Sequence, residues 1–141
     1  MIYQDFLEKY MGEKVDWDKA FGAQCVDLAR QYFEEVWGAT RDQQPEGVVG
    51  AQDFANHISR PKQRLLCNWT PAVPGLLPPV GSVVVMRAWP ANRFGHIGIC
   101  HDADKDIITL FDQDGFKQDG AKLTRWRYDD RVAGWLTKKD A

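Results

Sequence analysis

The order of local patterns along the chain constrains its fold more than any other feature of the sequence. Apolar residues recur at helical spacing over 2–11 and 24–37, and Gly12 and Gly38 end these two segments. After Gly81, β-branched and aromatic runs between turn residues predict strands over 82–89, 95–101, 106–111, 122–128 and 131–137. Helices that precede strands without alternation predict an α+β domain with an antiparallel sheet.

Length and charge exclude several classes of protein. The chain has 141 residues, and its 18 basic and 20 acidic side chains give a net charge of −2. This size predicts a single domain over 1–141 with a core of its own. The near-neutral charge predicts no nucleic-acid partner, and the longest apolar run, around 83–86, is too short for membrane insertion. Residues 1–10 carry acidic side chains within their apolar pattern, so we expect no secretory signal.

Cys25 is the strongest candidate for a chemically reactive side chain. Three cysteines are too few for a disulfide framework, and no CxxC spacing suggests zinc. We interpret Cys67 and Cys100 as structural residues, whereas Cys25 begins the more regular helical segment. Unpaired N–H groups and the positive end of the helix dipole favour the thiolate there, which is the nucleophilic form of cysteine. A buried structural cysteine is the alternative.

A nucleophilic thiolate needs a histidine partner, and the chain has three histidines. His57 falls in a short helical segment and His101 lies next to a polar turn, whereas His96 opens a strand. A hairpin symmetric about Asp104 would place His96 directly opposite Asp112, on one face of the sheet. The carboxylate could then orient the imidazole, although a slip of one residue would move it to the other face.

At these residues the sequence resembles the CHAP family, the cysteine, histidine-dependent amidohydrolases and peptidases. The run 22–28 holds the cysteine, 95–99 holds the histidine, and 111–114 holds an acid followed by glutamine. The run 79–83 matches a turn before the central strand, and 134–136 matches the closing strand. The resemblance covers nearly the whole chain. It implies a papain-like α+β fold, with N-terminal helices packed on a C-terminal antiparallel sheet, and hydrolysis of amide bonds in bacterial peptidoglycan through a thioester acyl-enzyme.

The resemblance also implies roles for individual residues. Cys25 would be the nucleophile, His96 the general base, and Asp112 the residue that orients His96. Gln24 would donate to the oxyanion together with the backbone N–H of Cys25, and a helix-capping role for Gln24 is equally open. Asp114 stands where the family often has asparagine. An ionised acid cannot donate a hydrogen bond, which leaves the catalytic role of Asp114 open.

Many members of this family are phage endolysins, which implies a partner and a location. The partner would be bacterial peptidoglycan, and the protein would wait in the host bacterial cytoplasm until a holin-type lesion opens the membrane. The bond cleaved, an N-acetylmuramoyl-L-alanine amide or a peptide bond, is left open. A tail-associated wall hydrolase, a cysteine amidase acting on another amide, and a catalytically silent wall-binding module are the alternatives. We expect no organic cofactor.

The loop before Cys25 carries the spacing of a calcium site. Asp16, Asp18 and Asp27 stand at positions 1, 3 and 12 of a window with EF-hand-type ligand spacing. The window departs from a true EF-hand because Phe21 replaces the glycine at position 6. Several CHAP endolysins carry calcium in such a loop. This resemblance supports as ligands the carboxylates of Asp16, Asp18 and Asp27 and the backbone carbonyls of Ala20 and Gly22. A solvated acidic loop is the alternative.

Two tryptophans near the predicted site receive different interpretations. Trp89 lies in the loop before His96 and is the best candidate for contact with substrate. Trp126 could also line a groove, but its run, 122–127, alternates with arginines and is typical of a solvated strand face. Core packing is the alternative for each aromatic residue.

Overall fold

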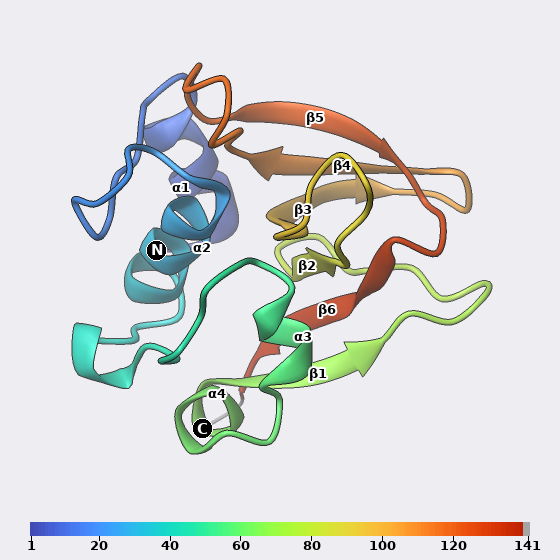
Figure 1. Ribbon diagram of the computed structural model, residues 1–141, viewed down its shortest axis with the longest axis horizontal. Helices are drawn as coiled ribbons and strands as arrows, with labels where there is room; N and C mark the ends of the chain where they lie inside the picture. Colours follow the sequence, from blue (N-terminus) through green and yellow to red (C-terminus); the bar gives the residue numbers. More distant parts are fainter. Residues whose placement is uncertain (140–141) are drawn as a thin grey trace.

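The elements follow the predicted order, with helices first and strands after them (Figure 1). The computed structural model describes residues 1–139. The helical elements are α1 (Tyr3–Tyr10), α2 (Cys25–Glu35), the 3₁₀ turn η1 (Arg41–Gln43), α3 (Asp53–Asn56) and α4 (Pro61–Leu66). The strands are β1 (Cys67–Pro71), β2 (Val83–Met86), β3 (His96–Ala103), β4 (Ile107–Asp112), β5 (Lys122–Arg127) and β6 (Val132–Lys138). The α+β class predicted from the sequence is confirmed.

The strands form one six-stranded antiparallel sheet in the order β1-β6-β2-β3-β4-β5. β2 is central, and all its residues are buried. Val83 and Val85 face the helices while Val84 and Met86 face the opposite side, because successive side chains alternate across a strand. A strand covered on both faces needs such a continuous apolar run.

The main core lies between the helices and one face of the sheet. α2 packs against β3 and β4, and its apolar stripe includes Leu28, Tyr32 and Phe33, which are all buried. Phe6 of α1 meets Tyr32 edge to face, with ring centroids 5.0 Å apart. Full burial of one such side chain contributes about 1.5–3 kcal/mol to stability. Within residues 1–139, no helix is both long and apolar enough to cross a membrane.

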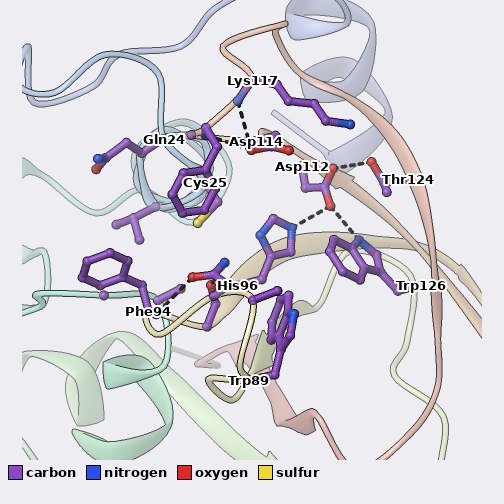
Figure 2. Close-up of a pocket in the computed structure, with 18 of the residues that line it drawn as sticks. Gln24, Cys25, Trp89, Phe94, His96, Asp112, Asp114, Lys117, Thr124 and Trp126 are labelled. Carbon is purple, nitrogen blue, oxygen red and sulfur yellow. Dashed lines mark hydrogen bonds and ion pairs between the residues drawn. The ribbon is translucent and has the colours of Figure 1, made fainter.

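The ends of three elements meet at one edge of this structure. β3 begins at His96 and β4 ends at Asp112, and these antiparallel neighbours bring both residues to the same end of the sheet. α2 begins beside them at Cys25 (Figure 2). The start of α2 is fixed by Asp27, whose Oδ2 accepts the backbone N–H of Gln24 at 3.0 Å. The fold thus brings residues from distant parts of the sequence into one site.

Candidate active site

Cys25 opens onto a pocket at the N-terminal end of α2. The pocket has a volume of about 390 Å³, and His96 and Asp112 belong to its wall. Cys25 is half-buried, whereas the other two cysteines are buried in the core. Burial raises the pKa of the Cys67 and Cys100 thiols to about 12, which disfavours their thiolates. Among the cysteines, the structure therefore leaves Cys25 as the accessible candidate nucleophile.

His96 and Asp112 form a buried, hydrogen-bonded pair beside this thiol (Figure 2). His96 Nε2 lies 2.7 Å from Asp112 Oδ2. Because Nε2 is bound to the carboxylate, Nδ1 is the ring nitrogen left for the thiol of Cys25, which is close enough to raise the pKa of the imidazole. The other two histidines, His57 and His101, do not line this pocket. The three residues that the sequence predicts to act together therefore meet in one place.

The surroundings of His96 favour its charged form. Burial by itself lowers the pKa of the imidazole, because it removes water from the cation. The hydrogen bonds and charges of Asp112 and Cys25 outweigh burial and raise the pKa from its ordinary value of 6.5 to about 10. An imidazolium next to a cysteine in turn stabilises the thiolate. The arrangement suits a thiolate–imidazolium pair held by a carboxylate.

The register of the β3–β4 hairpin differs from the predicted one. Ile99 pairs with Phe111, and a β-bulge lies between this pair and the turn. The hairpin is therefore not symmetric about Asp104, and the prediction that His96 stands directly opposite Asp112 is wrong. The two residues still share a face of the sheet and meet along a diagonal, because the error in register is an even number of residues.

Gly98 makes this diagonal contact possible. The pairing of Ile99 with Phe111 places Gly98 opposite Asp112 at the next position. A Cβ atom on Gly98 would lie 3.0 Å from the Cβ of Asp112, which is closer than ordinary van der Waals contact. Since Gly98 has no side chain, the Asp112 carboxylate can lean across it towards His96.

Two side chains of β5 complete the surroundings of Asp112. Thr124 Oγ1 donates to Asp112 Oδ1 at 2.7 Å, and Trp126 Nε1 donates to Asp112 Oδ2 at 2.9 Å. β5 alternates between half-buried and exposed residues. The solvated face predicted for this strand is correct for its arginines, whereas Thr124 and Trp126 face the pocket. Their period-two spacing was the signal that could have identified them.

Gln113 connects the end of β4 to the loop before the nucleophile. Its buried side chain accepts the N–H of Val15 at 2.7 Å and donates to the carbonyls of Val15 and Gln24 at 3.0 and 2.8 Å. Gln24 is the N-cap residue of α2. One amide therefore links the neighbour of Asp112 to the residue that precedes Cys25. No pattern in the sequence assigns Gln113 a role, although Gln113 lies in the matching run 111–114.

Asp114 organises the loop that follows β4. Its Oδ1 accepts the backbone N–H groups of Phe116 and Lys117 at 2.8 and 3.2 Å, and its backbone carbonyl accepts that of Gln118 at 3.0 Å. The Gln118 side chain binds both backbone polar groups of Ala23. A carboxylate suits this role because it only accepts hydrogen bonds. Asp114 thus supports the segment before the nucleophile.

Gln24 and Trp89 both border the pocket. Gln24 holds the N-cap position of α2, directly before the nucleophile. Trp89 is half-buried, meets Trp126 edge to face at a centroid distance of 5.9 Å, and lies under the guanidinium of Arg131 at 5.2 Å. The oxyanion role of Gln24 and the substrate contact of Trp89 stay predictions, with both residues at the site.

Three carboxylates gather in the loop before α2. One oxygen from each of Asp16, Asp18 and Asp27 lies within 4.8 Å of the other two. Asp16 Oδ1 is buried and has no hydrogen-bond partner among residues 1–139. Burial and the charges of the other two carboxylates raise the pKa of Asp27 to about 7, against the lowering effect of the hydrogen bond from Gln24. A buried, uncompensated carboxylate oxygen in this cluster fits a hard cation such as calcium.

The backbone of this loop makes the sharp turn that a calcium loop requires. Phe21 has a φ of 63°, in the left-handed region, at the position where an EF-hand has glycine. Lys19 and Gly22 share this region, with φ values of 58° and 74°. The loop therefore adopts the turn without the glycine, at a cost of about 1 kcal/mol or more for each non-glycine residue. The carbonyls of Ala20 and Gly22 belong to this turn, and their part as ligands stays a prediction.

The fold and the pocket define a cysteine–histidine–carboxylate site on an α+β scaffold. The chain belongs to the CHAP domain family, whose profile matches residues 14–114. This span includes Cys25, His96 and Asp112. No curated protein sequence matches the chain. The resemblance seen in the sequence is confirmed.

Solved structures of larger proteins share the fold. The wild-type endolysin LysIME-EF1 matches 98% of this chain with a TM-score of 0.70 and 19% identity. Ly7917 matches 95% with a TM-score of 0.63 and 16% identity, and its structure with the hydrolysing product of MDP matches 95% with a TM-score of 0.66 and 17% identity. The chain spans 65% of the first protein and 60% of the second. At these identities, the likeness shows a common fold.

Proposed function

We propose that this protein hydrolyses an amide bond of bacterial peptidoglycan, with Cys25 as its nucleophile. The observation that carries the proposal is the position of His96, which is bound to Asp112 through Nε2 and faces Cys25 with its other nitrogen. Membership of the CHAP family supports the reaction class. The fold shared with an endolysin, and with a protein whose structure contains the hydrolysing product of MDP, supports the substrate.

The first half of the reaction starts from the Cys25 thiolate and the His96 imidazolium. Sγ attacks the carbonyl carbon of the amide, and the carbonyl oxygen of the tetrahedral intermediate becomes negatively charged. The backbone N–H of Cys25 and the side-chain amide of Gln24 stabilise this oxygen. The C–N bond then breaks as the proton on His96 Nδ1 passes to the leaving amine, which leaves a thioester on Cys25.

The second half releases the acyl group to water. His96, now neutral, takes a proton from a water molecule at Nδ1 while the water oxygen attacks the thioester carbonyl. The C–S bond breaks, so that a carboxylic acid leaves and the thiolate–imidazolium pair is restored. Asp112 stays ionised throughout and fixes the ring so that Nε2 carries its proton towards the carboxylate.

We also propose that the loop before α2 holds calcium. Asp16, Asp18 and Asp27 would supply carboxylate oxygens, and Ala20 and Gly22 would supply backbone carbonyls. The cation would add to the positive charge of Arg30, which already interacts with Asp18 and Asp27. The buried, unpartnered Oδ1 of Asp16 supports this proposal. Since Asp27 also fixes the N-cap of α2, the cluster bears directly on the start of the nucleophile helix.

Digestion of purified peptidoglycan tests the enzyme assignment. The wild type and Cys25→Ser are incubated with walls of several chemotypes, with calcium and a reductant present, and the soluble fragments are analysed by mass spectrometry. We expect fragments from the wild type alone, and their new termini identify the bond. Equal release by Cys25→Ser would exclude Cys25 as the nucleophile. Binding to walls without release from any chemotype would instead indicate a wall-binding module.

The endolysin role is a further part of the proposal, supported by the fold shared with LysIME-EF1. Under this role, the protein would be stored in the host cytoplasm and released through a holin-type lesion. Expression in a host with and without a co-expressed holin tests this role, and we expect lysis only when the membrane is opened. Recovery of the protein in purified phage particles would favour the tail-associated alternative.

A further inference from the structure

We infer that Trp126 is a positioning residue of this site, whose indole fixes the Asp112 carboxylate and the ring of His96 so that Nδ1 of the imidazole is directed towards Cys25. The inference rests on the roles proposed above for Cys25, His96 and Asp112. Trp126 lies on β5, which provides none of those residues. The test of this inference follows the reactivity of the Cys25 thiol and needs no peptidoglycan substrate.

The first contact is a hydrogen bond to an oxygen that His96 already uses. Trp126 Nε1 donates to Asp112 Oδ2 at 2.9 Å, and His96 Nε2 lies 2.7 Å from the same oxygen. Thr124 holds the other oxygen, Oδ1, at 2.7 Å. Donors on both oxygens fix the rotation of the carboxylate. Because two of these donors come from β5, this strand sets the direction in which Asp112 meets the imidazole (Figure 2).

The second contact is between the two rings. The ring centroids of Trp126 and His96 lie 4.8 Å apart, with their planes inclined by 38°. A cation within about 6 Å of an indole ring is attracted by its π electrons. The indole therefore limits rotation of the imidazole and also stabilises its charged form. Trp126 acts on His96 in two ways, through the carboxylate and through the ring.

Trp126 is itself held by contacts with other residues. The Trp89 ring meets it edge to face at 5.9 Å, and the guanidinium of Arg131 lies 5.2 Å from the Trp89 ring and 5.9 Å from the Trp126 ring. Arg131 is in turn held by Asp129, with Nε 3.0 Å from Oδ1. The position of the indole is thus defined by contacts other than those with His96 and Asp112, as a positioning role requires.

A purely structural role would need only the bulk of an aromatic ring. Phenylalanine would fill much of the same space at position 126 but could not donate to Asp112. Trp126→Phe therefore removes the hydrogen bond while a ring is kept, and Trp126→Leu removes both contacts. Thr124→Val removes the donor to the other oxygen, and Thr124→Ser keeps that donor.

Alkylation of Cys25 as a function of pH is the readout. The rate of modification by iodoacetamide is followed peptide by peptide with mass spectrometry, from about pH 4 to pH 10, which separates Cys25 from the buried Cys67 and Cys100. Several charged groups surround His96 or line the pocket, and all are left unchanged in these variants: Cys25, Asp112, Asp114, Lys117, Lys122 and Arg131. A change in the rate therefore reports how His96 is placed beside Cys25.

We expect iodoacetamide to modify the accessible Cys25 of the wild type and to leave the buried Cys67 and Cys100 unmodified. A hydrogen bond to a charged group corresponds to about ten- to a hundred-fold in an equilibrium. Alkylation at about pH 6 should therefore fall about ten-fold or more in Trp126→Phe, further in Trp126→Leu, and measurably in Thr124→Val. Thr124→Ser should restore the wild-type profile.

Trp69→Phe is the matched control, since Trp69 packs against the main core on β1 at the far edge of the sheet. Wild-type profiles for folded Trp126→Phe and Trp126→Leu would overturn the inference, as would an equal shift in Trp69→Phe. The peptidoglycan digest is a separate experiment. A wild type that digests no wall, but whose Cys25 profile depends on Trp126, would contradict the proposed function and leave this inference standing.

Discussion

Gly98 and Asp112 stand opposite each other in the sheet, so the carboxylate reaches His96 across a position that has no side chain. The pairing of Ile99 with Phe111 sets this register. A methyl group at position 98 would approach the Cβ atoms of Asp112 and Leu110 to 3.0 Å. The geometry of the His96–Asp112 pair therefore depends on Gly98, because Gly98 has no side chain that would block the carboxylate.

Gly98→Ala should displace Asp112 and weaken its bond to His96. Overpacking of a buried site costs about 1–3 kcal/mol, so we expect the free energy of unfolding in urea to fall by this amount. Alkylation of Cys25 at about pH 6 should slow at the same time, because His96 loses its partner. Gly115→Ala is the control for stability, since a Cβ there would lie 3.5 Å from its nearest neighbour. A Gly98→Ala protein with wild-type stability and thiol reactivity would contradict this account.

The fold could be predicted from the sequence where the pattern was local and long enough. The helix at Cys25–Glu35 and the strands after Gly81 have clear periods in the sequence, and the structure has elements there. α4 and β1 were not predicted. β1 is short and ends in Pro71, and its place in the sheet depends on pairing with β6 far along the chain. Proline is tolerated there because β1 is an edge strand.

The site could be predicted to the extent that each residue had a local signal. Cys25 begins a regular helix, and His96 and Asp112 sit at strand ends in matching runs. The hairpin register was mistaken, because a β-bulge leaves no mark in a period-two pattern. The contact of Trp126 with Asp112 was not predicted, because the period-two pattern assigns Trp126 to one face of β5 but does not show which residue of β4 lies beside it.

The His96–Asp112 pair should make the protein less stable as the solution becomes alkaline. The pKa of His96 is raised from 6.5 to about 10 on folding. A group whose pKa rises on folding binds its proton more tightly in the folded state, so its contribution is fully present below about pH 6.5 and is lost as the pH rises through about 10. We expect the difference in unfolding free energy between the wild type and His96→Gln to shrink over this range. Urea titrations at several pH values measure this difference. If it is constant, His96 is not charged in the folded protein.

Gln113→Glu should destabilise the loop before the nucleophile although the side chain keeps its size. The amide Nε2 donates to the carbonyls of Val15 and Gln24, and a carboxylate oxygen in its place would face both without a proton. Each buried polar group left unpaired costs about 1–3 kcal/mol. We expect a lower urea midpoint and slower alkylation of Cys25. Gln43→Glu in the exposed turn η1 is the matched control, because the Gln43 side chain only accepts the N–H of Thr40 through Oε1, and an equal loss in both variants would contradict the role of Gln113.

Calcium should raise the melting temperature of this protein, and EDTA should reverse the effect. A ligand that binds only the folded state stabilises it in proportion to the logarithm of its concentration over Kd. Asp27→Asn removes one charge from the carboxylate cluster and keeps an oxygen for the N–H of Gln24. Without calcium, we expect this variant to be at least as stable as the wild type, because it relieves the burial of a charge and the repulsion that together raise the pKa of Asp27. With calcium, it should gain much less than the wild type.

The exposed Asp130 provides the control for this experiment, since Asp130→Asn removes the same charge outside the cluster and should leave the response to calcium intact. Magnesium tests the nature of the site, because Mg²⁺ demands a smaller octahedral cage and gives up its water reluctantly. We therefore expect a smaller shift in melting temperature with magnesium than with calcium at equal concentration. Identical melting curves of the wild type in calcium and in EDTA would exclude the site. A calcium response that Asp27→Asn retains in full would place the ion elsewhere, because Asp27 is one of the three carboxylates proposed to bind it.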